Sequence, residues 1–221
     1  MGNYPEGSLP VVTKRKLLII PAAIIAVIIL SVCSVFLFFQ FADWGFSREI
    51  PFPEQLQRLL TVHTAEQWLG VKEGSSDHQK ILQIYNSHEP LAQGYAVTTE
   101  DSWCAAFASC VAIQCRLTGI VPTECGCERQ IGLWNSLGCW EENDNYMPLP
   151  GDYIYYAWNE TTFFEDCTGW ADHVGIVVGT AGPFIKVIEG NKDDMVSYRI
   201  IMRGDYRIRG FGLPDYTTKN Q

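Results

Sequence analysis

An uncharged apolar run from Leu17 to Phe39 constrains this chain more than any other feature of its sequence. The run is 23 residues long and is interrupted only by Pro21, Ser31 and Ser34. About 20 consecutive apolar residues are enough for a helix to cross the hydrocarbon core of a bilayer. The sequence therefore predicts one transmembrane helix over residues 17–39.

The charges on either side of the run predict its orientation. Three basic residues, 14–16, come immediately before it, and a basic cluster next to a span stays in the cytoplasm. A cleaved signal peptide is the alternative, but its apolar region is shorter, at about 7–15 residues, and ends at small residues. The sequence Phe38–Phe41 offers no such site, so we expect a single-pass protein of the cell membrane. Residues 1–16 would be cytoplasmic, and everything after residue 40 would be extracytoplasmic.

The rest of the 221 residues provides one globular domain. An apolar fraction of 47% is sufficient for a packed core. A net charge of −9 argues against a nucleic-acid partner, because binding to phosphates depends on Lys and Arg. We expect a linker over residues 40–63, a catalytic domain over 64–216 and a short tail over 217–221.

The pattern of the domain predicts helices first and strands afterwards. A helix capped by Thr64 precedes further helices over residues 77–87, from about 101 to 118, and near 127–137. Short strands are predicted over residues 152–157, 173–178, 183–189, 196–202 and 206–211. This order indicates an α+β fold in which helices pack on one side of an antiparallel sheet.

Cys104 is the first residue with a chemically distinctive position. Asp101 or Ser102 is expected to cap the helix that follows, which places Cys104 in the first turn. Free N–H groups and the helix dipole stabilise a thiolate there, and the same N–H groups can stabilise an oxyanion. The other interpretation is an unreactive cysteine in a buried helix.

His173 is the histidine best placed to act as a base for Cys104. It opens an apolar strand, whereas His63, His78 and His88 lie in the N-terminal helical region and are expected to be solvated or capping residues. On the next strand, Glu189 and Asn191 are two residues apart, and either could accept a hydrogen bond from the imidazole. A histidine satisfied within the core is the alternative for His173.

Four segments in a fixed order resemble the CHAP family of cysteine, histidine-dependent amidohydrolases/peptidases, which are related to NlpC/P60 and papain-like enzymes. They are Asp101-Ser-Trp-Cys-Ala-Ala-Phe-Ala-Ser-Cys, Pro150-Gly-Asp-Tyr-Ile-Tyr-Tyr, Asp172-His-Val-Gly-Ile-Val and Val187-Ile-Glu-Gly-Asn. The resemblance implies a papain-like fold with Cys104 as nucleophile, His173 as general base, Glu189 as the residue that orients it, and Asn191 as a further polar site residue. It implies no cofactor, and because the family's calcium-loop pattern is missing, we expect no metal.

Six further cysteines lie after the apolar run: Cys110, Cys115, Cys125, Cys127, Cys139 and Cys167. In an exported domain they could form up to three disulfides. Buried thiols or a zinc site are alternatives, although the usual two-residue spacing of zinc ligands is missing. The segment 123–146, which carries three of them, lies outside the minimal family pattern and is expected to be a structural clasp.

The reaction implied by the resemblance is hydrolysis of an amide in bacterial peptidoglycan. The bond would be the N-acetylmuramoyl–L-alanine amide or a peptide bond of the stem or cross-bridge. Trp103 and Trp170, which flank the expected catalytic residues, are candidates for a substrate groove. A wall-binding scaffold without turnover, or a transamidase using the same residues, are the alternatives, and a partner within an envelope complex is compatible with either.

Overall fold

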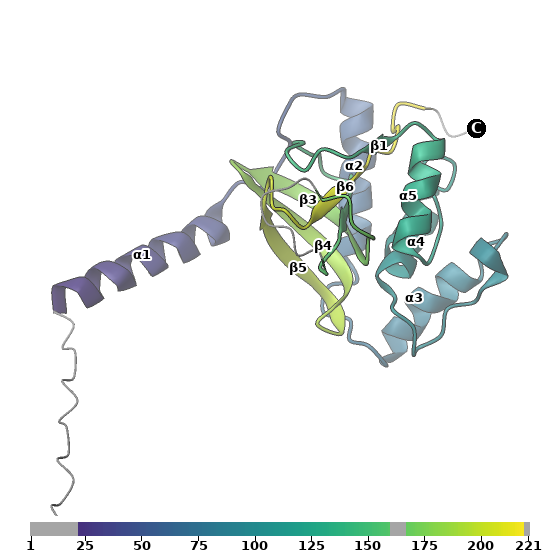
Figure 1. Ribbon diagram of the computed structural model, residues 1–221, viewed down its shortest axis with the longest axis horizontal. Coiled ribbons are helices and arrows are strands. Elements are labelled where there is room, and N and C mark those ends of the chain that lie inside the picture. Colours follow the sequence, from purple (N-terminus) through teal and green to yellow (C-terminus); the bar gives the residue numbers. More distant parts are fainter. Residues whose placement is uncertain (1–21, 160–166, 219–221) are drawn as a thin grey trace, which may run out of the picture. The chain divides into compact units, whose positions relative to one another are not determined.

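The computed structural model describes residues 22–159 and 167–218 (Figure 1). It divides into two compact units, residues 1–42 and residues 43–221, and each is considered separately. The expected cytoplasmic segment 1–16, the first five residues of the expected transmembrane span, and residues 219–221 of the tail lie outside the described part of the chain.

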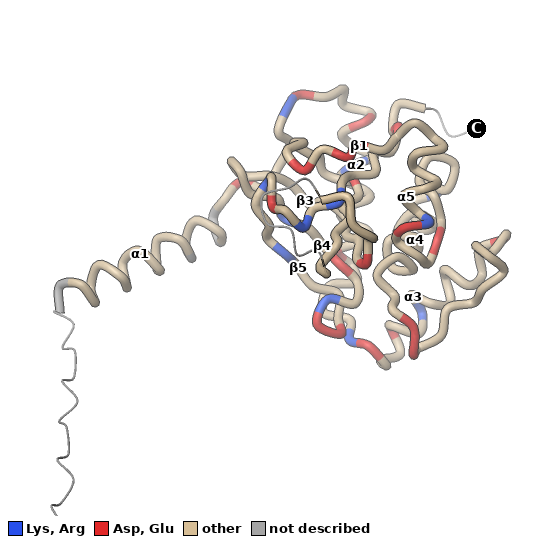
Figure 2. Tube along the Cα trace, in the orientation of Figure 1, with Lys and Arg blue, Asp and Glu red and all other residues tan. Residues whose placement is uncertain are grey.

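Within the first unit, residues Ala22–Phe41 form helix α1. No charged residue falls on this helix (Figure 2), and large apolar side chains such as Ile24, Val27 and Leu30 are exposed along it. Among the residues that the structure describes, no helix has the length and apolarity needed to cross a membrane. The transmembrane span over residues 17–39 thus stays a prediction.

The second unit is built around one antiparallel sheet of six strands in the order β1-β6-β2-β3-β4-β5. The strands are β1 (Trp140–Glu141), β2 (Tyr153–Tyr156), β3 (His173–Ala181), β4 (Phe184–Lys192), β5 (Met195–Met202) and β6 (Ile208–Gly212). Five of them match the predicted strands. The two-residue β1 carries too little pattern to be recognised in the sequence.

Helices α2 (Phe52–Glu66), α3 (Ser76–Asn86), α4 (Cys104–Gln114) and α5 (Cys127–Ser136), with the short 3-10 helix η1 (Ala92–Gly94), complete the described part of this unit. Helix α4 packs against β3 and β4, and α3 packs on α4 (Figure 1). All but the last two residues of α4 are buried, as its apolar and small side chains require. The predicted α+β fold with an antiparallel sheet is confirmed.

Side chains of β2 alternate between two apolar clusters, one on each face of the sheet. Tyr153 and Tyr155 lie in the cluster that includes the helices, whereas Ile154 and Tyr156 lie in a second cluster with Phe211. Both faces of this strand are therefore buried.

Close packing of α4 on the sheet depends on Gly190. A Cβ atom at this position would lie 2.5 Å from the Cβ of Phe107 on α4. Because no side chain separates the two backbones, the start of α4 is held next to the strands that carry His173 and Glu189.

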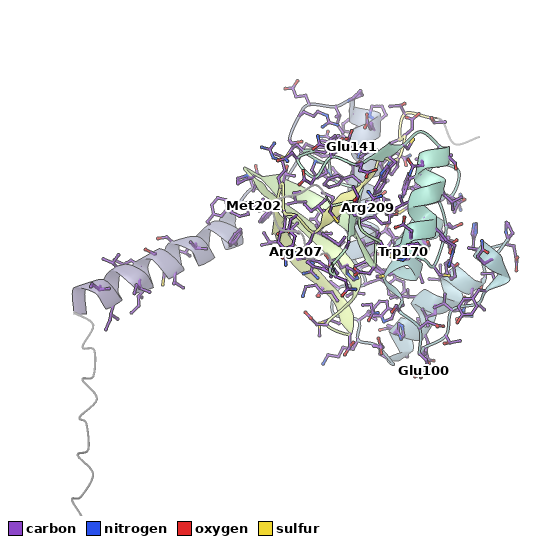
Figure 3. The ribbon with its side chains drawn as sticks, viewed as in Figure 1. Glu100, Glu141, Trp170, Met202, Arg207 and Arg209 are labelled. Atoms are coloured by element: carbon purple, nitrogen blue, oxygen red, sulfur yellow. The ribbon has the colours of Figure 1, made fainter. Side chains whose placement is uncertain are left out.

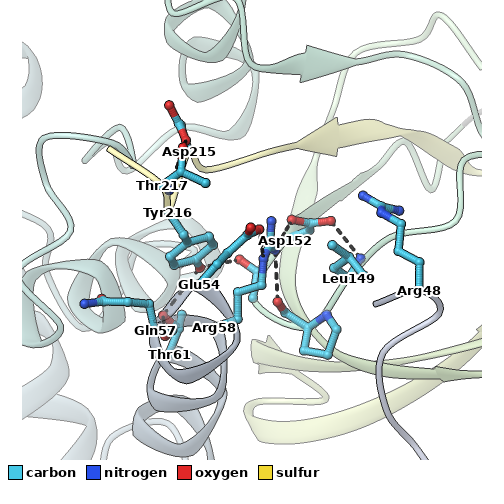
Figure 4. A network of polar contacts seen from close by, with 12 residues as sticks. Arg48, Glu54, Gln57, Arg58, Thr61, Leu149, Asp152, Asp215, Tyr216 and Thr217 are labelled. Carbon is cyan, nitrogen blue, oxygen red and sulfur yellow. Dashed lines mark hydrogen bonds and ion pairs between the residues drawn. The ribbon is translucent and has the colours of Figure 1, made fainter. Parts of the chain in front are cut away.

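The expected linker over residues 40–63 is wrong for its second half. Helix α2 begins at Phe52, next to a proline in its first turn, and Thr64 lies near its end and not at its N-cap. The helix belongs to the domain because Arg58, Thr61 and Val62 are buried in it. The guanidinium of Arg58 donates a 2.7 Å hydrogen bond to Asp152 in the turn before β2 (Figure 4).

Candidate active site

Cys104 lies in the first turn of α4, as the sequence predicted, but it is the first residue of the helix and the cap is different. Trp103 occupies the N-cap position and its side chain makes no capping hydrogen bond. The carboxylate of Asp101 is engaged elsewhere, where it accepts hydrogen bonds from Thr98 and Tyr95. The first turn of a helix has no intrahelical partners for its N–H groups, so the N–H groups beside Cys104 can stabilise a negative charge.

His173 begins β3 and lies opposite Tyr156 on β2. The two rings stack with centroids 6.0 Å apart. The Nε2 atom of His173 is 3.1 Å from a carboxylate oxygen of Glu189 on β4, which is fully buried. A carboxylate at this nitrogen fixes the tautomer and the orientation of the imidazole, and leaves Nδ1 as the nitrogen available to Cys104.

The charges of the site favour a thiolate–imidazolium pair. A hydrogen bond from Cys127, and after it the interactions with His173 and the Val174 backbone, hold the pKa of Cys104 well below its ordinary value although burial opposes this. Burial would lower the pKa of His173, but hydrogen bonds and charges of Cys104 and Glu189 raise it to about 10. Burial likewise opposes ionisation of Glu189, yet His173 and Arg199 keep its pKa below the ordinary value.

Arg199 on β5 is a site residue that the sequence reasoning missed. Its Nε atom lies 2.7 and 2.9 Å from the two oxygens of Glu189, and its guanidinium stacks 4.3 Å above the ring of Trp158. Arg199 is the one charged residue in the sequence of β5, and this is the signal that could have identified it. It fixes the carboxylate that in turn fixes His173.

Cys127, the first residue of α5, also belongs to the site. Its sulfur is 3.7 Å from that of Cys104, and both residues are buried. The thiolate of Cys104 is the main reason why the pKa of Cys127 is raised well above its ordinary value, so Cys127 is the protonated partner. The segment 123–146 therefore contributes to the site and is more than the expected clasp.

Two sets of contacts hold Cys127 in this position. The hydroxyl of Ser109 on α4 donates to the carbonyl of Glu124 at 2.8 Å and accepts from its N–H at 3.0 Å. The buried carboxylate of Glu124 then accepts from the N–H groups of Cys125 and Gly126 just before α5. The loop that carries Cys127 is thereby tied to the helix that carries Cys104.

The other cysteines of the expected disulfide framework form no disulfide among the residues that the structure describes. Cys110, Cys115, Cys125 and Cys139 carry free thiols, as Cys127 does in the site, and Cys167 is buried. Within the described ranges, no group of three or more His, Cys, Asp or Glu side chains is arranged to hold a metal ion.

Asn191, which was expected to be a further polar residue of the site, does not contact the other described site residues through a hydrogen bond. It lies at φ 57° where the pairing of β4 with β5 shifts register between Glu189 and Lys192. This irregularity breaks the simple alternation by which Asn191 was expected to share a face with Glu189. Among the described residues, Asn191 makes no hydrogen bond to Cys104, His173 or Glu189.

The two tryptophans expected to line a groove have opposite environments. Trp103 is fully buried, and its indole N–H donates to Glu73 at 2.9 Å. It therefore differs from the expectation and offers no surface to a substrate. Trp170 is 76% exposed (Figure 3) and lines a hollow of about 290 Å³ with Ala157 and with Asp172, the residue before His173.

Among the other histidines, His78 differs from expectation. It was expected to be solvated or to cap a helix, but it is fully buried and its ring packs 4.5 Å from that of Trp103. Its Nδ1 atom accepts a hydrogen bond from the N–H of Gly74. Burial lowers the pKa of His78, so it is a neutral core residue.

No protein-family model matches this chain, and neither the curated proteins nor the solved structures contain a match to it. Its function is therefore inferred from the chemistry of the site and from the sequence segments that resemble the CHAP family.

Proposed function

We propose that this chain is a cysteine amidohydrolase/peptidase with a papain-like fold of the CHAP type, and that it hydrolyses an amide bond of peptidoglycan. One observation carries the proposal. A cysteine at an uncapped helix start, a histidine with a raised pKa and a buried carboxylate form one connected set, from Cys104 through His173 to Glu189. Nucleophile, base and orienting group are the three roles that cysteine-dependent acyl transfer needs.

The reaction follows from these positions. The thiolate of Cys104 attacks the amide carbonyl, and the N–H groups at the start of α4 stabilise the oxyanion. The imidazolium of His173 gives its proton to the leaving amine, which leaves an acyl group on Cys104 as a thioester. Neutral His173 then takes a proton from water, the water attacks the thioester, and the thiolate is restored. Glu189 and Arg199 keep the imidazole oriented through both steps.

Peptidoglycan is proposed as the substrate because of the resemblance and the predicted topology. The basic residues 14–16 before the apolar run favour a cytoplasmic N-terminus, which would put the domain outside the membrane, next to the wall. The net charge of −9 is unsuited to nucleic acid. The exposed Trp170 lines a hollow that also includes Asp172, the residue before His173, and its ring is available to stack on a sugar or a peptide of the substrate.

The test is digestion of purified sacculi by the full chain, kept in mild detergent, with mass spectrometry of the soluble products. New N-termini at L-alanine identify the amidase, and new termini within the stem or cross-bridge identify the endopeptidase. Products joined to an added amine indicate a transamidase. The Cys104→Ala variant should release nothing, and Cys139→Ser, a change at a thiol outside the site, should leave product release unaltered.

Two results would contradict the proposal. If no bond is cleaved although the chain binds sacculi, the protein is a wall-binding scaffold. If Cys104→Ala digests sacculi as well as the unaltered chain, the nucleophile is a different residue. Release of the chain from membranes after deletion of residues 1–42, but not before, tests the anchor separately.

A further inference from the structure

The second thiol of the site has no role in the proposed hydrolysis beyond its hydrogen bond to Cys104. We propose that Cys104 and Cys127 form a reversible disulfide when the protein meets a peroxide, and that this oxidative modification closes the active site. The inference deepens the proposed function, because the same sulfur that would attack an amide is the one that is oxidised.

The geometry allows this bond with a small movement. The sulfurs are 3.7 Å apart and a disulfide is about 2.05 Å long, so they must approach by about 1.6 Å. Each cysteine is the first residue of its helix, where a side-chain rotation meets no preceding helical turn. The Ser109–Glu124 hydrogen bonds tie the loop before Cys127 to the middle of α4, which keeps Cys127 beside Cys104.

Burial selects the kind of oxidant. Cys104 is 4% exposed and Cys127 is 7% exposed, so the smallest oxidants reach the two sulfurs fastest. Hydrogen peroxide has the size of two water molecules and can use the route by which hydrolytic water would reach the acyl group. The low pKa of Cys104 supplies the thiolate that peroxide oxidation requires.

The chemistry proceeds in two balanced steps. The Cys104 thiolate attacks one oxygen of hydrogen peroxide, the O–O bond breaks, and a sulfenic acid and hydroxide form. The Cys127 sulfur then attacks the sulfenic sulfur, the S–O bond breaks, and hydroxide leaves and takes up the proton of the thiol. Together one thiolate, one thiol and one hydrogen peroxide give one disulfide, one water and one hydroxide, and the hydroxide becomes a second water by taking the proton of the His173 imidazolium. A dithiol restores both thiols by exchange.

The electrostatics of the pair assist the second step. The thiolate of Cys104 is the main cause of the raised pKa of Cys127. A sulfenic acid carries no such charge, so oxidation of Cys104 removes the reason for Cys127 to keep its proton. Cys127 also begins α5, and the positive end of a helix stabilises a thiolate. The first oxidation therefore activates the residue that completes the disulfide.

The experiment treats the full chain with hydrogen peroxide, blocks the remaining thiols, and maps the peptides by mass spectrometry without reduction. We expect one linked pair, the peptide with Cys104 joined to the peptide with Cys127. Dithiothreitol should then restore nearly all alkylation of Cys104 and all digestion of sacculi. In Cys127→Ala and Cys127→Ser, oxidation should continue to the sulfinic acid, and recovery should fall by about tenfold or more. Cys139→Ser should behave as the unaltered chain.

The outcomes separate this inference from the proposed function. If Cys104 and Cys127 stay unlinked and recovery is equally poor with and without Cys127, the disulfide is refuted. If they link reversibly but sacculi are never digested, the disulfide stands and the proposed function fails. Circular dichroism of both Cys127 variants shows whether the fold is intact, and the serine variant serves where alanine leaves a destabilising cavity.

Discussion

Two buried carboxylates, those of Glu189 and Asp152, are each paired with an arginine, yet they behave differently. Asp152 is 1% exposed and accepts from Arg58 and from the N–H of Leu149 (Figure 4). Burial raises its pKa despite the ion pair. Glu189 is 0% exposed, and its pKa is lowered because Arg199 and His173 together overcome the burial.

The two buried arginine–carboxylate pairs have different roles: one holds the fold together, and the other orients a residue of the candidate active site. The Arg58–Asp152 pair connects α2 to the turn before β2, where the guanidinium also donates to the carbonyl of Pro150 and covers the ring of Tyr216 at 4.6 Å. The groups that contact this pair connect elements of the fold and do not belong to the candidate active site. Glu189 has a histidine as its second partner, and through it the negative charge acts on Cys104.

The largest effect is expected for His173→Ala. Without the imidazolium, the thiolate loses a stabilising charge and the leaving amine loses its proton donor, so kcat/KM should fall by about 10³-fold. The free energy of unfolding should change little by comparison. Digestion kinetics and the rate of iodoacetamide alkylation of Cys104 at neutral pH measure the loss. An unchanged alkylation rate would contradict the pairing.

The Asp152→Asn change should lower the stability of the domain and leave its activity largely intact. It removes one of the two carboxylates that pair with the buried Arg58 guanidinium and leaves Glu54, so the free energy of unfolding should fall by about 3 kcal/mol, the lower end of the cost of breaking a buried pair. Urea denaturation measures this, and the activity per folded molecule should persist. Combined replacement by Arg58→Met and Asp152→Leu should recover most of the stability. A single variant as stable as the parent would show that the pair contributes nothing.

Glu189→Gln tests the electrostatic half of the comparison. Glu189 stabilises the protonated form of His173, whose pKa of about 10 lies above the ordinary 6.5, so the imidazolium is present at neutral pH and is lost as pH rises through about 10. Removing the charge lowers this pKa. The alkaline limb of kcat/KM should therefore move down by about one pH unit or more, with about a tenfold loss at its optimum. Glu66→Gln, a carboxylate that contacts Tyr198 outside the site, is the control.

Arg199→Lys should be milder. Lysine keeps the positive charge but loses the planar guanidinium that contacts both oxygens of Glu189 and stacks on Trp158. We expect a fall in kcat/KM of about threefold to tenfold with KM unchanged, and a larger fall in Arg199→Met, which removes the charge. If methionine is tolerated as well as lysine, Arg199 does not position the carboxylate through its charge.

The smallest effect should come from Trp170→Ala. Its side chain is exposed, so the free energy of unfolding should stay within about 0.5 kcal/mol of the parent. If this residue lines the substrate site, KM should rise by about threefold to tenfold with kcat retained. Equal KM values for the variant and the parent would show that Trp170 does not contact the substrate.

Much of the fold follows from local sequence patterns. The apolar alternation and the turn residues predicted five of the six strands, and the helices over 76–86, 104–114 and 127–136 lie where capping and composition indicated. The misplaced start of α2 has a physical reason. Its buried face includes Arg58, whose charge is compensated by Glu54 one turn earlier and by Asp152 in a distant turn, and a sequence pattern does not record the second pairing.

The candidate site was likewise predicted in part from the sequence. Helix propensity and apolar patterning placed Cys104 at the start of a helix and His173 at the start of a strand, and strand spacing offered Glu189 or Asn191 as its partner. The family resemblance favoured Glu189, and in the structure it is Glu189 that lies 3.1 Å from the imidazole of His173. Asp101 was misjudged as the cap because its contacts with Thr98 and Tyr95 form in the preceding turn.

By itself, the sequence determined an apolar segment with a basic flank, an α+β order of elements, and a cysteine with free N–H groups beside it. These features depend on residues close together in the chain. Only the tertiary structure decided that Cys127 touches Cys104, that Arg199 holds Glu189, and that Trp103 is buried. Each of these contacts joins segments whose distance is set by the packing of helices on the sheet, and no local pattern encodes that distance.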